Sequence, residues 1–418
     1  MLARTVLANR TAAVAVIIPV RDRAAMLDRC LAATGSQYPV IVVDDGSADP
    51  AAIAAIAARH GAAVRSRAAN GGPAAARNTG LAGLRSDLIA FLDSDCVPPE
   101  DWVDSLARHF ADPLVGAVAP RIVPVGAPAA TAVASYTTVC GSLDLGPHPA
   151  RVLPGGRVSY VPTAALVARR AALESVTAGR AGPFDQALRN GEDVDLIWRL
   201  HEAGWRIRYE PSVQVPHDGP ASWTALLARR FQYGTSAAPL ARRHPGNLAP
   251  LVLHPWPSLT VAAALARRPV AATAGLAAAW LDLTSALRRA GVPADGSATA
   301  AVTAAQQTWL GVGRYVTQFG VPAIALVLAR PGGKSAARRW GRRAAVASLL
   351  LGPALDAYRQ CEPELDPVRF TLARIADDVC YGAGVWTGCL RERTLNPVKP
   401  LVSGRLLRLS GRQGDGKD

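Results

Sequence analysis

Aromatic residues are scarce, since Trp, Tyr and Phe make up 6% of the 418 residues although half of the chain is hydrophobic. Acidic residues are outnumbered as well, at 32 against 46 basic ones, which gives a net charge of +14. An apolar fraction carried by alanine rather than aromatic residues suits helices better than a β-sandwich. Only 19% of the residues are charged, so the composition excludes an acidic, intrinsically disordered chain.

Cysteine is also rare, with six residues and no C-x-x-C pair. This excludes a disulfide framework and a zinc knuckle. The first apolar run is short and ends at Arg21, which is not the pattern of a cleaved signal peptide. We therefore expect the catalytic part of the chain to face the cytoplasm.

The first 110 residues or so alternate apolar, β-branched runs with helix-like stretches. Such alternation is typical of βαβ units around a buried parallel sheet and predicts a three-layer α/β sandwich. Pro50 and Pro73 stand where helices would begin. A further helix is expected at 191–203. The expected strands are residues 13–20, 40–43, 62–67, 88–92, 116–124, 159–170, 206–210 and 213–217.

After residue 245 the chain changes to long Ala/Leu/Val stretches broken by pairs of arginines. This change predicts two domains, at 1–245 and 246–418. No stretch is an uninterrupted apolar run of the roughly 20 residues that a membrane span needs. Three interpretations stay open, namely helices lying on a membrane, spanning helices and a soluble helical domain, and we favour the first.

Residues 330–343 carry six basic side chains and no acid. Next to apolar helices, such a cluster suits an anionic membrane surface, and it predicts a location at the cytoplasmic face of the cell membrane. A solvated helix face is the simpler alternative. We do not expect a nucleic-acid partner, because neither interleaved aromatic residues nor a binding motif accompanies the cluster.

Two pairs of acids follow expected strands directly. Asp44 and Asp45 end the run VIVV, and Asp93 and Asp95 follow LIAFL. Ligands bind at the carboxyl ends of strands in open α/β sheets, although an Asp-Gly turn can also simply cap the next helix. Acids delivered there need a cation or a donor-rich ligand, and Mg²⁺ or Mn²⁺ with a diphosphate would meet that need.

Three further features carry candidate chemistry. The glycine-rich turn at 70–72 opens a helix in which Arg77 can reach a phosphate or a base, although the turn has no Walker lysine. Glu192 and Asp193 begin the next predicted helix, where acids complement the macrodipole or, crowded together, serve proton chemistry. His217 is either a third metal ligand or a plain edge-strand histidine.

Taken in order, VVDDGS, NGGPAAARN, FLDSD and GEDVDL resemble the family 2 glycosyltransferases, which have the nucleotide-diphospho-sugar transferase A-type fold. The resemblance spans residues 13 to about 240 and implies a mostly parallel sheet. It implies that Asp44 and Asp45 line the nucleoside pocket and that Arg77 contacts the base or the phosphates. It also implies that Asp93 and Asp95 bind the ribose, the metal ion and the diphosphate.

The same resemblance places Asp193 at the position of the catalytic base, with Glu192 as its neighbour. It makes His217 a metal or diphosphate ligand, and Arg230 part of a basic-aromatic element that closes over the donor. A carboxylate that takes the proton of an attacking hydroxyl supports direct displacement of the nucleoside diphosphate. Such a single displacement inverts the anomeric centre.

Downstream, RIRYEPSVQVPHDGPASW and RRFQYGTSAAPLARRHPG are similar to the mycofactocin biosynthesis subfamily. This similarity implies UDP-glucose as donor, a small peptide-derived acceptor and a growing β-linked oligosaccharide. Three alternatives remain. They are a family 2 enzyme acting on a lipid-linked or cell-envelope glycan, a non-catalytic binding protein on a degenerate transferase fold, and a nucleotidyltransferase. The sequence makes no prediction about oligomeric state.

Overall fold

The computed structural model of the protein describes residues 13–125, 131–321, 324 and 336–403, and nothing is described of the side chains of 337 and 338. The chain divides into two compact units. One runs to Leu226 and includes Ser236–Leu248, and the other consists of Leu227–Thr235 and the residues from Ala249 onward. The predicted boundary at residue 245 falls near the end of the first unit. Within the basic stretch at 330–343, Arg330, Lys334 and the side chain of Arg338 lie outside the described residues.

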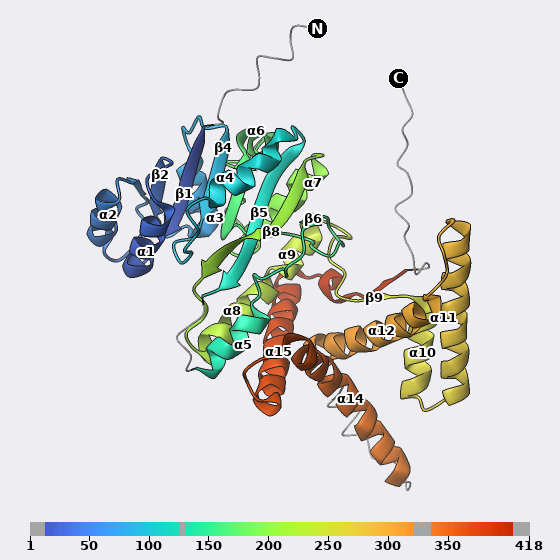
Figure 1. Ribbon diagram of the computed structural model, residues 1–418. Coiled ribbons are helices and arrows are strands. Elements are labelled where there is room, and N and C mark those ends of the chain that lie inside the picture. Colours follow the sequence, from blue (N-terminus) through green and yellow to red (C-terminus); the bar gives the residue numbers. More distant parts are fainter. Residues whose placement is uncertain (1–12, 126–130, 322–323, 325–335, 404–418) are drawn as a thin grey trace, which may run out of the picture. The chain divides into compact units, whose positions relative to one another are not determined.

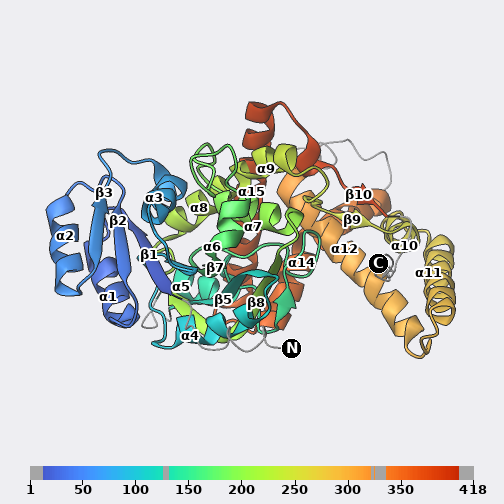
Figure 2. The same cartoon turned by 90° about the horizontal axis from the view of Figure 1, so that it is seen from above.

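The first unit is built on an eight-stranded sheet with the order β3-β2-β1-β4-β7-β5-β8-β6 (Figure 1). β1 pairs in parallel with β2 and β4, whereas β7 runs antiparallel between β4 and β5. Figure 2 shows β3, β2 and β1 side by side in this order. The strands are Val14–Val20 (β1), Val40–Asp44 (β2), Ala63–Ser66 (β3), Leu88–Leu92 (β4), Val115–Pro124 (β5), Ala150–Arg151 (β6), Ala165–Arg169 (β7) and Arg206–His217 (β8).

Each expected strand has a counterpart in the structure, with three differences. The segment expected at 159–170 is a strand only over Ala165–Arg169, and β6 was not predicted. The two segments expected at 206–210 and 213–217 form the single strand β8, which pairs in parallel with β5. The pairing register of β5 and β8 shifts after Pro120, so β8 contains a bulge between the two expected segments. An irregular pairing of this kind reads as two short strands in the sequence.

Helices cover both faces of this sheet and complete the predicted three-layer sandwich. Successive residues of β1 face opposite layers, so Val16 and Ile18 join one core and Ile17 joins the other. As predicted, prolines stand in the first turns of α2 and α3. The helices of this unit are Ala24–Thr34 (α1), Pro50–Arg59 (α2), Gly72–Leu81 (α3), Trp102–Ala107 (α4), Ala132–Cys140 (α5), Arg170–Ser175 (α6), Glu192–Glu202 (α7) and Ala237–Arg243 (α9).

The carboxyl ends of the parallel strands meet at one edge of the sheet, and this positions the candidate site. β2 ends at Asp44, β4 ends just before Asp93, and β8 ends at His217. Cys96 and His217 form an isolated β-bridge, and the amide of Asp218 donates to the carbonyl of Asp95 at 3.0 Å. The segment after β4 is thereby tied to the end of β8.

The second unit is helical. It contains Pro255–Leu265 (α10), Pro269–Arg289 (α11), Ser297–Phe319 (α12), Ala336–Cys361 (α14), Pro367–Glu392 (α15), the C-terminal part of Trp223–Thr235 (α8), and the paired strands Val252–Leu253 (β9) and Leu401–Val402 (β10). Gly382 of α15 faces the carbonyl of Gln318, and Gly384 faces that of Phe231. A Cβ at either glycine would collide with that carbonyl, so α15 packs backbone to backbone against α12 and α8.

α11 bears on the three interpretations that the sequence leaves open for the helical region. In the part of the chain that the structure describes, it is the helix with the length and mean hydropathy of a membrane span, even though Asp282 interrupts its apolar run. Little of it is buried within the protein. Length and composition alone do not distinguish a spanning helix from one that lies on a surface.

Candidate active site

Asp45 organises the glycine-rich loop that precedes α3. Its Oδ1 accepts hydrogen bonds from Arg67 Nε at 2.7 Å and from the amide of Gly71 at 3.0 Å, and its Oδ2 accepts one from the amide of Gly72 at 2.8 Å. The side chain is only 5% exposed. Asp45 therefore shapes the loop, and Arg67, which the sequence analysis missed, is its counter-ion.

Asp44 holds the turn after β2. Its Oδ1 accepts a hydrogen bond from the amide of Ser47 at 3.0 Å, and Ser47 in turn accepts one from the amide of Asp22, in the loop after β1. Gly46 has a positive φ of 73°, and a Cβ there would come within 2.8 Å of the Asn70 nitrogen. The loops after β1, β2 and β3 are thus packed together at the carboxyl edge, which is where ligands bind in open α/β sheets.

Arg77 joins two of the predicted motifs. Its guanidinium pairs with Glu192 Oε1 through Nη1 and with Asp93 Oδ1 through Nη2, both at 2.8 Å, and its side chain is 4% exposed. The guanidinium also lies over the ring of Phe184, with 5.6 Å to the centroid. Arg77 is therefore the cation that holds the acids after β4 and at the start of α7 together.

Asp95 lies between a cation and a histidine. One of its oxygens forms an ion pair with Arg23, and the other lies 3.4 Å from His217 Nε2. Among residues 13–125, 131–321 and 336–403, no three His, Cys, Asp or Glu side chains form a group placed to hold a metal ion. Mg²⁺ and Mn²⁺ take few carboxylate ligands when phosphate oxygens and water complete their shell. In this structure Asp95 pairs with Arg23, so its role as a metal ligand stays a prediction, as does that of His217.

The acid pair at the start of α7 is desolvated. Glu192 is 6% exposed, and burial together with the charge of Asp193 raises its pKa to about 7, against the opposing charge of Arg77. Burial raises the pKa of Asp193 as well, although its side chain is half-buried rather than enclosed. Carboxylates with raised pKa values are stronger proton acceptors, which suits them to general-base chemistry.

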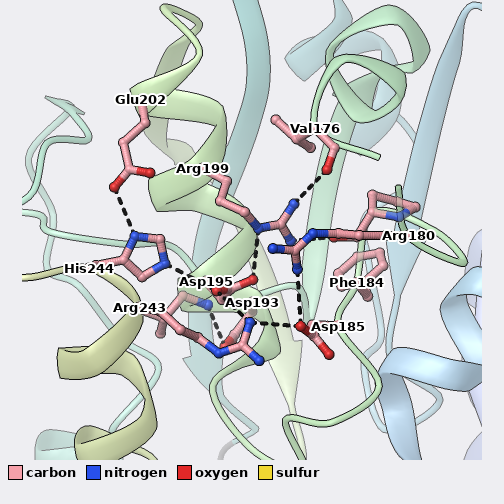
Figure 3. Close-up of polar contacts among 12 residues, drawn as sticks. Val176, Arg180, Phe184, Asp185, Asp193, Asp195, Arg199, Glu202, Arg243 and His244 are labelled. Atoms are coloured by element: carbon pink, nitrogen blue, oxygen red, sulfur yellow. Dashed lines mark hydrogen bonds and ion pairs between the residues drawn. The ribbon is translucent and has the colours of Figure 1, made fainter. Parts of the chain in front are cut away.

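The third acid of this segment has a different environment. Asp195 is 1% exposed and lies within hydrogen-bond distance of Arg199 and His244 (Figure 3). Burial opposes its ionisation, but the hydrogen bond with His244 and the charge of Arg199 lower the pKa of Asp195 to about 2. Asp195 therefore stays charged and belongs to a buried ion cluster rather than to the acid pair.

Arg230 lies in the second unit. It forms an ion pair with Asp377 of α15 and lies over the ring of Tyr381, 5.4 Å from the centroid. Arg230 thus has an ion-pair partner within the second unit. The predicted role of Arg230 at the donor stays a prediction.

Comparison with known proteins agrees with these features. Residues 15–175 match the family described as Glycosyl transferase family 2. A Pre-mycofactocin glycosyltransferase from Mycobacterium tuberculosis is 39% identical over 410 residues, which cover 93% of this chain and 82% of the relative. Glycosyltransferase AglE from Haloferax volcanii is 30% identical over 236 residues, or 53% of this chain and 71% of that protein.

Among solved structures, the mannosyltransferase PcManGT from Pyrobaculum calidifontis, in complex with GDP-Man and Mn²⁺, is similar over 82% of this chain and 88% of its own. Its TM-score is 0.41 and its sequence identity is 19%. The family assignment comes instead from the matched residues 15–175 and from the relative that aligns along nearly the whole chain. On these grounds, the chain is a member of glycosyltransferase family 2.

Proposed function

We propose that this chain transfers glucose from UDP-glucose to a hydroxyl of pre-mycofactocin and then extends a β-linked oligosaccharide on it. The observation that carries the proposal is the 39% identity over 93% of the chain to a Pre-mycofactocin glycosyltransferase. Because that similarity includes the helical unit as well as the sheet, it reaches beyond the donor motifs that family 2 enzymes share. UDP-glucose as the donor rests on the subfamily resemblance in the sequence.

Proton transfer is assigned to Asp193. Glu192 is held by Arg77 and is nearly enclosed, whereas Asp193 is half-buried and is the more open of the two to an acceptor hydroxyl. As the hydroxyl oxygen attacks the anomeric carbon, the Asp193 carboxylate accepts its proton and the bond to the diphosphate breaks. One displacement inverts the α-linked sugar of the donor, so the product is a β-glycoside.

The donor is assigned to the carboxyl edge of the sheet. The Asp44 and Asp45 turns, with Arg67, frame the nucleoside side. Asp95 and His217, with Asp93, would hold Mg²⁺ or Mn²⁺. When bound, such an ion neutralises charge that develops on the departing diphosphate.

A donor and acceptor screen tests this proposal. The full chain is incubated with Mn²⁺ or Mg²⁺ and UDP-glucose, UDP-galactose, GDP-mannose or dTDP-rhamnose, with and without pre-mycofactocin, and nucleoside diphosphate release is followed. We expect release from UDP-glucose that depends on the acceptor. Release only with lipid extracts would move the function to a lipid-linked or cell-envelope acceptor.

We also propose that the helical unit binds the anionic cytoplasmic face of the membrane. On α11, Val270 is 81% exposed and Leu281 is 60% exposed, and exposed arginine pairs stand beside both ends of the helix. Apolar side chains flanked by basic ones suit an interface with anionic lipids, and each basic residue near the surface adds about 1 kcal/mol.

Vesicle sedimentation tests the membrane proposal. We expect the full chain to sediment with phosphatidylglycerol/phosphatidylcholine vesicles, and the double variant Val270→Asp, Leu281→Asp to remain largely in the supernatant. Leu114→Asp is the matched control, because Leu114 is 47% exposed but belongs to the sheet unit. Equal sedimentation of all three proteins would contradict a membrane-binding face on α11.

A further inference from the structure

A cluster of buried charges surrounds Asp195, one helical turn along α7 from Glu192 (Figure 3). Arg199 Nε donates to Asp195 Oδ2 at 2.8 Å, while His244 Nε2 lies 3.1 Å and Arg243 Nη1 lies 3.6 Å from Oδ1. Buried ion clusters contribute little net stability, because the cost of desolvation offsets their attraction. The cluster does fix the positions of three segments relative to one another, namely α7, α9 and residues 176–185.

The first of these segments is α9. His244 directly follows α9, is 3% exposed, and reaches α7 at two places, since its Nδ1 also lies 2.8 Å from Glu202 Oε1. Its ring packs edge-on against Trp198, with the centroids 5.2 Å apart. The end of α9 is therefore fixed to the middle and the last turn of α7.

The start of α9 lies against the start of α7. Gly191 has a positive φ of 82° and immediately precedes Glu192. A Cβ at Gly191 would come within 3.0 Å of Leu240 and 3.1 Å of Ser236. A movement of α9 would therefore be transmitted directly to the residue before the acid pair.

The second segment is the 176–185 loop, the first part of the connection between α6 and α7. Arg199 donates to the carbonyls of Val176, at 2.9 Å, and of Pro183, and Arg243 pairs with Asp185 at 2.7 Å. These contacts hold the loop against α7 and α9.

The same loop supports the cation of the site. Phe184 is 1% exposed, its ring packs edge-on against Phe91 at 5.2 Å, and the Arg77 guanidinium lies over it. Its backbone exchanges two hydrogen bonds with the Asn78 side chain, at 2.7 and 3.1 Å. The ion cluster thus reaches Arg77, the partner of Glu192, through the loop, and reaches Glu192 itself through α7.

We infer that Asp195 and His244 are positioning residues for the acid pair. They hold α9 and the 176–185 loop against α7, so that Glu192 and Asp193 keep one placement relative to Arg77. The side-chain hydrogen bonds of both residues are to side chains of the cluster and not to the acid pair. The inference rests on the proposed function, because Asp193 needs a fixed place only if it takes a proton during transfer.

The inference predicts which kinetic constant changes. The residues assigned to the donor, such as Asp45 and Asp95, follow β2 and β4 and make no contact with the cluster in the described part of the chain. Asp93 alone among the residues assigned to the donor shares Arg77 with Glu192, so disturbing the cluster should lower kcat far more than it raises the KM for the donor. Misplacing a base by about 1 Å can cost on the order of 100-fold in rate, so kcat should fall by about 10- to 100-fold.

The experiment compares His244→Ala and His244→Gln in the full chain. His60→Gln is the matched control, because His60 also pairs with an aspartate, Asp28, at 2.7 Å, but at the end of α2. For each protein, kcat and the KM for UDP-glucose are measured with pre-mycofactocin, and thermal unfolding is recorded. For His244→Ala we expect a loss of kcat that is much larger than any rise in KM. We expect partial recovery for His244→Gln, whose amide can donate to Asp195, and wild-type values for His60→Gln.

Asp195→Asn gives a second route if His244→Ala does not fold. Asp195→Asn should lower kcat as His244→Gln does. The double variant Asp195→Asn, His244→Gln should have a kcat no lower than that of the slower single variant, because both substitutions act on the same contact between Asp195 and His244. A wild-type kcat in His244→Gln and Asp195→Asn, or a KM that rises in step with the loss of kcat, would overturn the inference. Turnover with another nucleotide sugar would contradict the proposed donor, and the variants would then be compared with that sugar.

Discussion

Replacing Glu192 by glutamine removes a carboxylate whose ionisation the fold opposes. Burial, followed by the charge of Asp193, raises the pKa of Glu192 from its ordinary value of 4.5 to about 7, although Arg77 lies 2.8 Å away and favours the charged form. The folded protein therefore binds this proton more tightly than the unfolded chain does. Consequently, this group lowers the stability of the folded state as the pH rises from 4.5 through 7.

The size of the effect follows from the two pKa values. A group that titrates at 4.5 when unfolded and at about 7 when folded makes the protein less stable by about 2.5 kcal/mol at pH 8 than at pH 5. Glutamine cannot ionise, so the variant does not carry this loss. Any change that the substitution makes to packing is present at both pH values and cancels in the comparison.

Urea unfolding of wild type and Glu192→Gln at pH 5 and pH 8, followed by tryptophan fluorescence, measures the difference. We expect the free energy of unfolding of the variant to gain about 2.5 kcal/mol relative to wild type between the two pH values. Glu174→Gln, at an exposed position on α6, is the control and should show no such gain. The same wild-type-to-variant difference at both pH values would refute the reasoning that burial raises the pKa of Glu192.

Three further predictions concern the site directly. Asp193→Asn should abolish transfer while isothermal titration still detects nucleotide-sugar binding; turnover at the wild-type rate would remove Asp193 from the base role. Asp95→Ala should lose the Mn²⁺-dependent part of donor binding, measured by titration with and without chelator, and identical metal dependence in the variant would exclude Asp95 as a ligand. Arg67→Gln leaves the buried Asp45 without its counter-ion, so it should weaken UDP binding and lower the midpoint of thermal unfolding, whereas Arg59→Gln, at an exposed ion pair of α2, should change neither.

The sheet and the placement of the acids were predictable from the sequence for a local reason. Apolar runs such as 13–20 and 88–92 alternate with helix-like stretches, and this alternation predicts parallel strands. Once the strands are parallel, Asp44 and Asp93 must lie at the same edge, since each follows a strand's carboxyl end. The position of both acids therefore follows from short-range pattern alone.

The partners of those acids were not predictable in this way. Arg67 is 22 residues from Asp45, Arg23 is 72 residues from Asp95, and His244 is 49 residues from Asp195. Pairings over such separations depend on how the elements pack, which has no signature in local spacing. A weak signal did exist for the last pair, because a histidine such as His244, at the basic end of α9, needs an acid in reach when it is buried and charged.

The division of α8 between the two units was also beyond the sequence. Residues 227–235 look like a continuation of the first domain, yet they belong to the helical unit. The reason is a close approach of two helices, in which Gly234 of α8 lies against the backbone of Tyr381 and Gly384 of α15 lies against Phe231. Single glycines in two helices far apart in the chain do not reveal that they face each other.

The anomeric configuration of the product tests the central claim most directly. The full chain is incubated with UDP-glucose, Mn²⁺ and pre-mycofactocin, and the product is analysed by mass spectrometry and by the proton NMR coupling at the new anomeric centre. The account predicts added glucose in β linkage with wild type and none with Asp193→Asn. An α-linked product, or transfer that persists in Asp193→Asn, would contradict a single inverting displacement with Asp193 as the base.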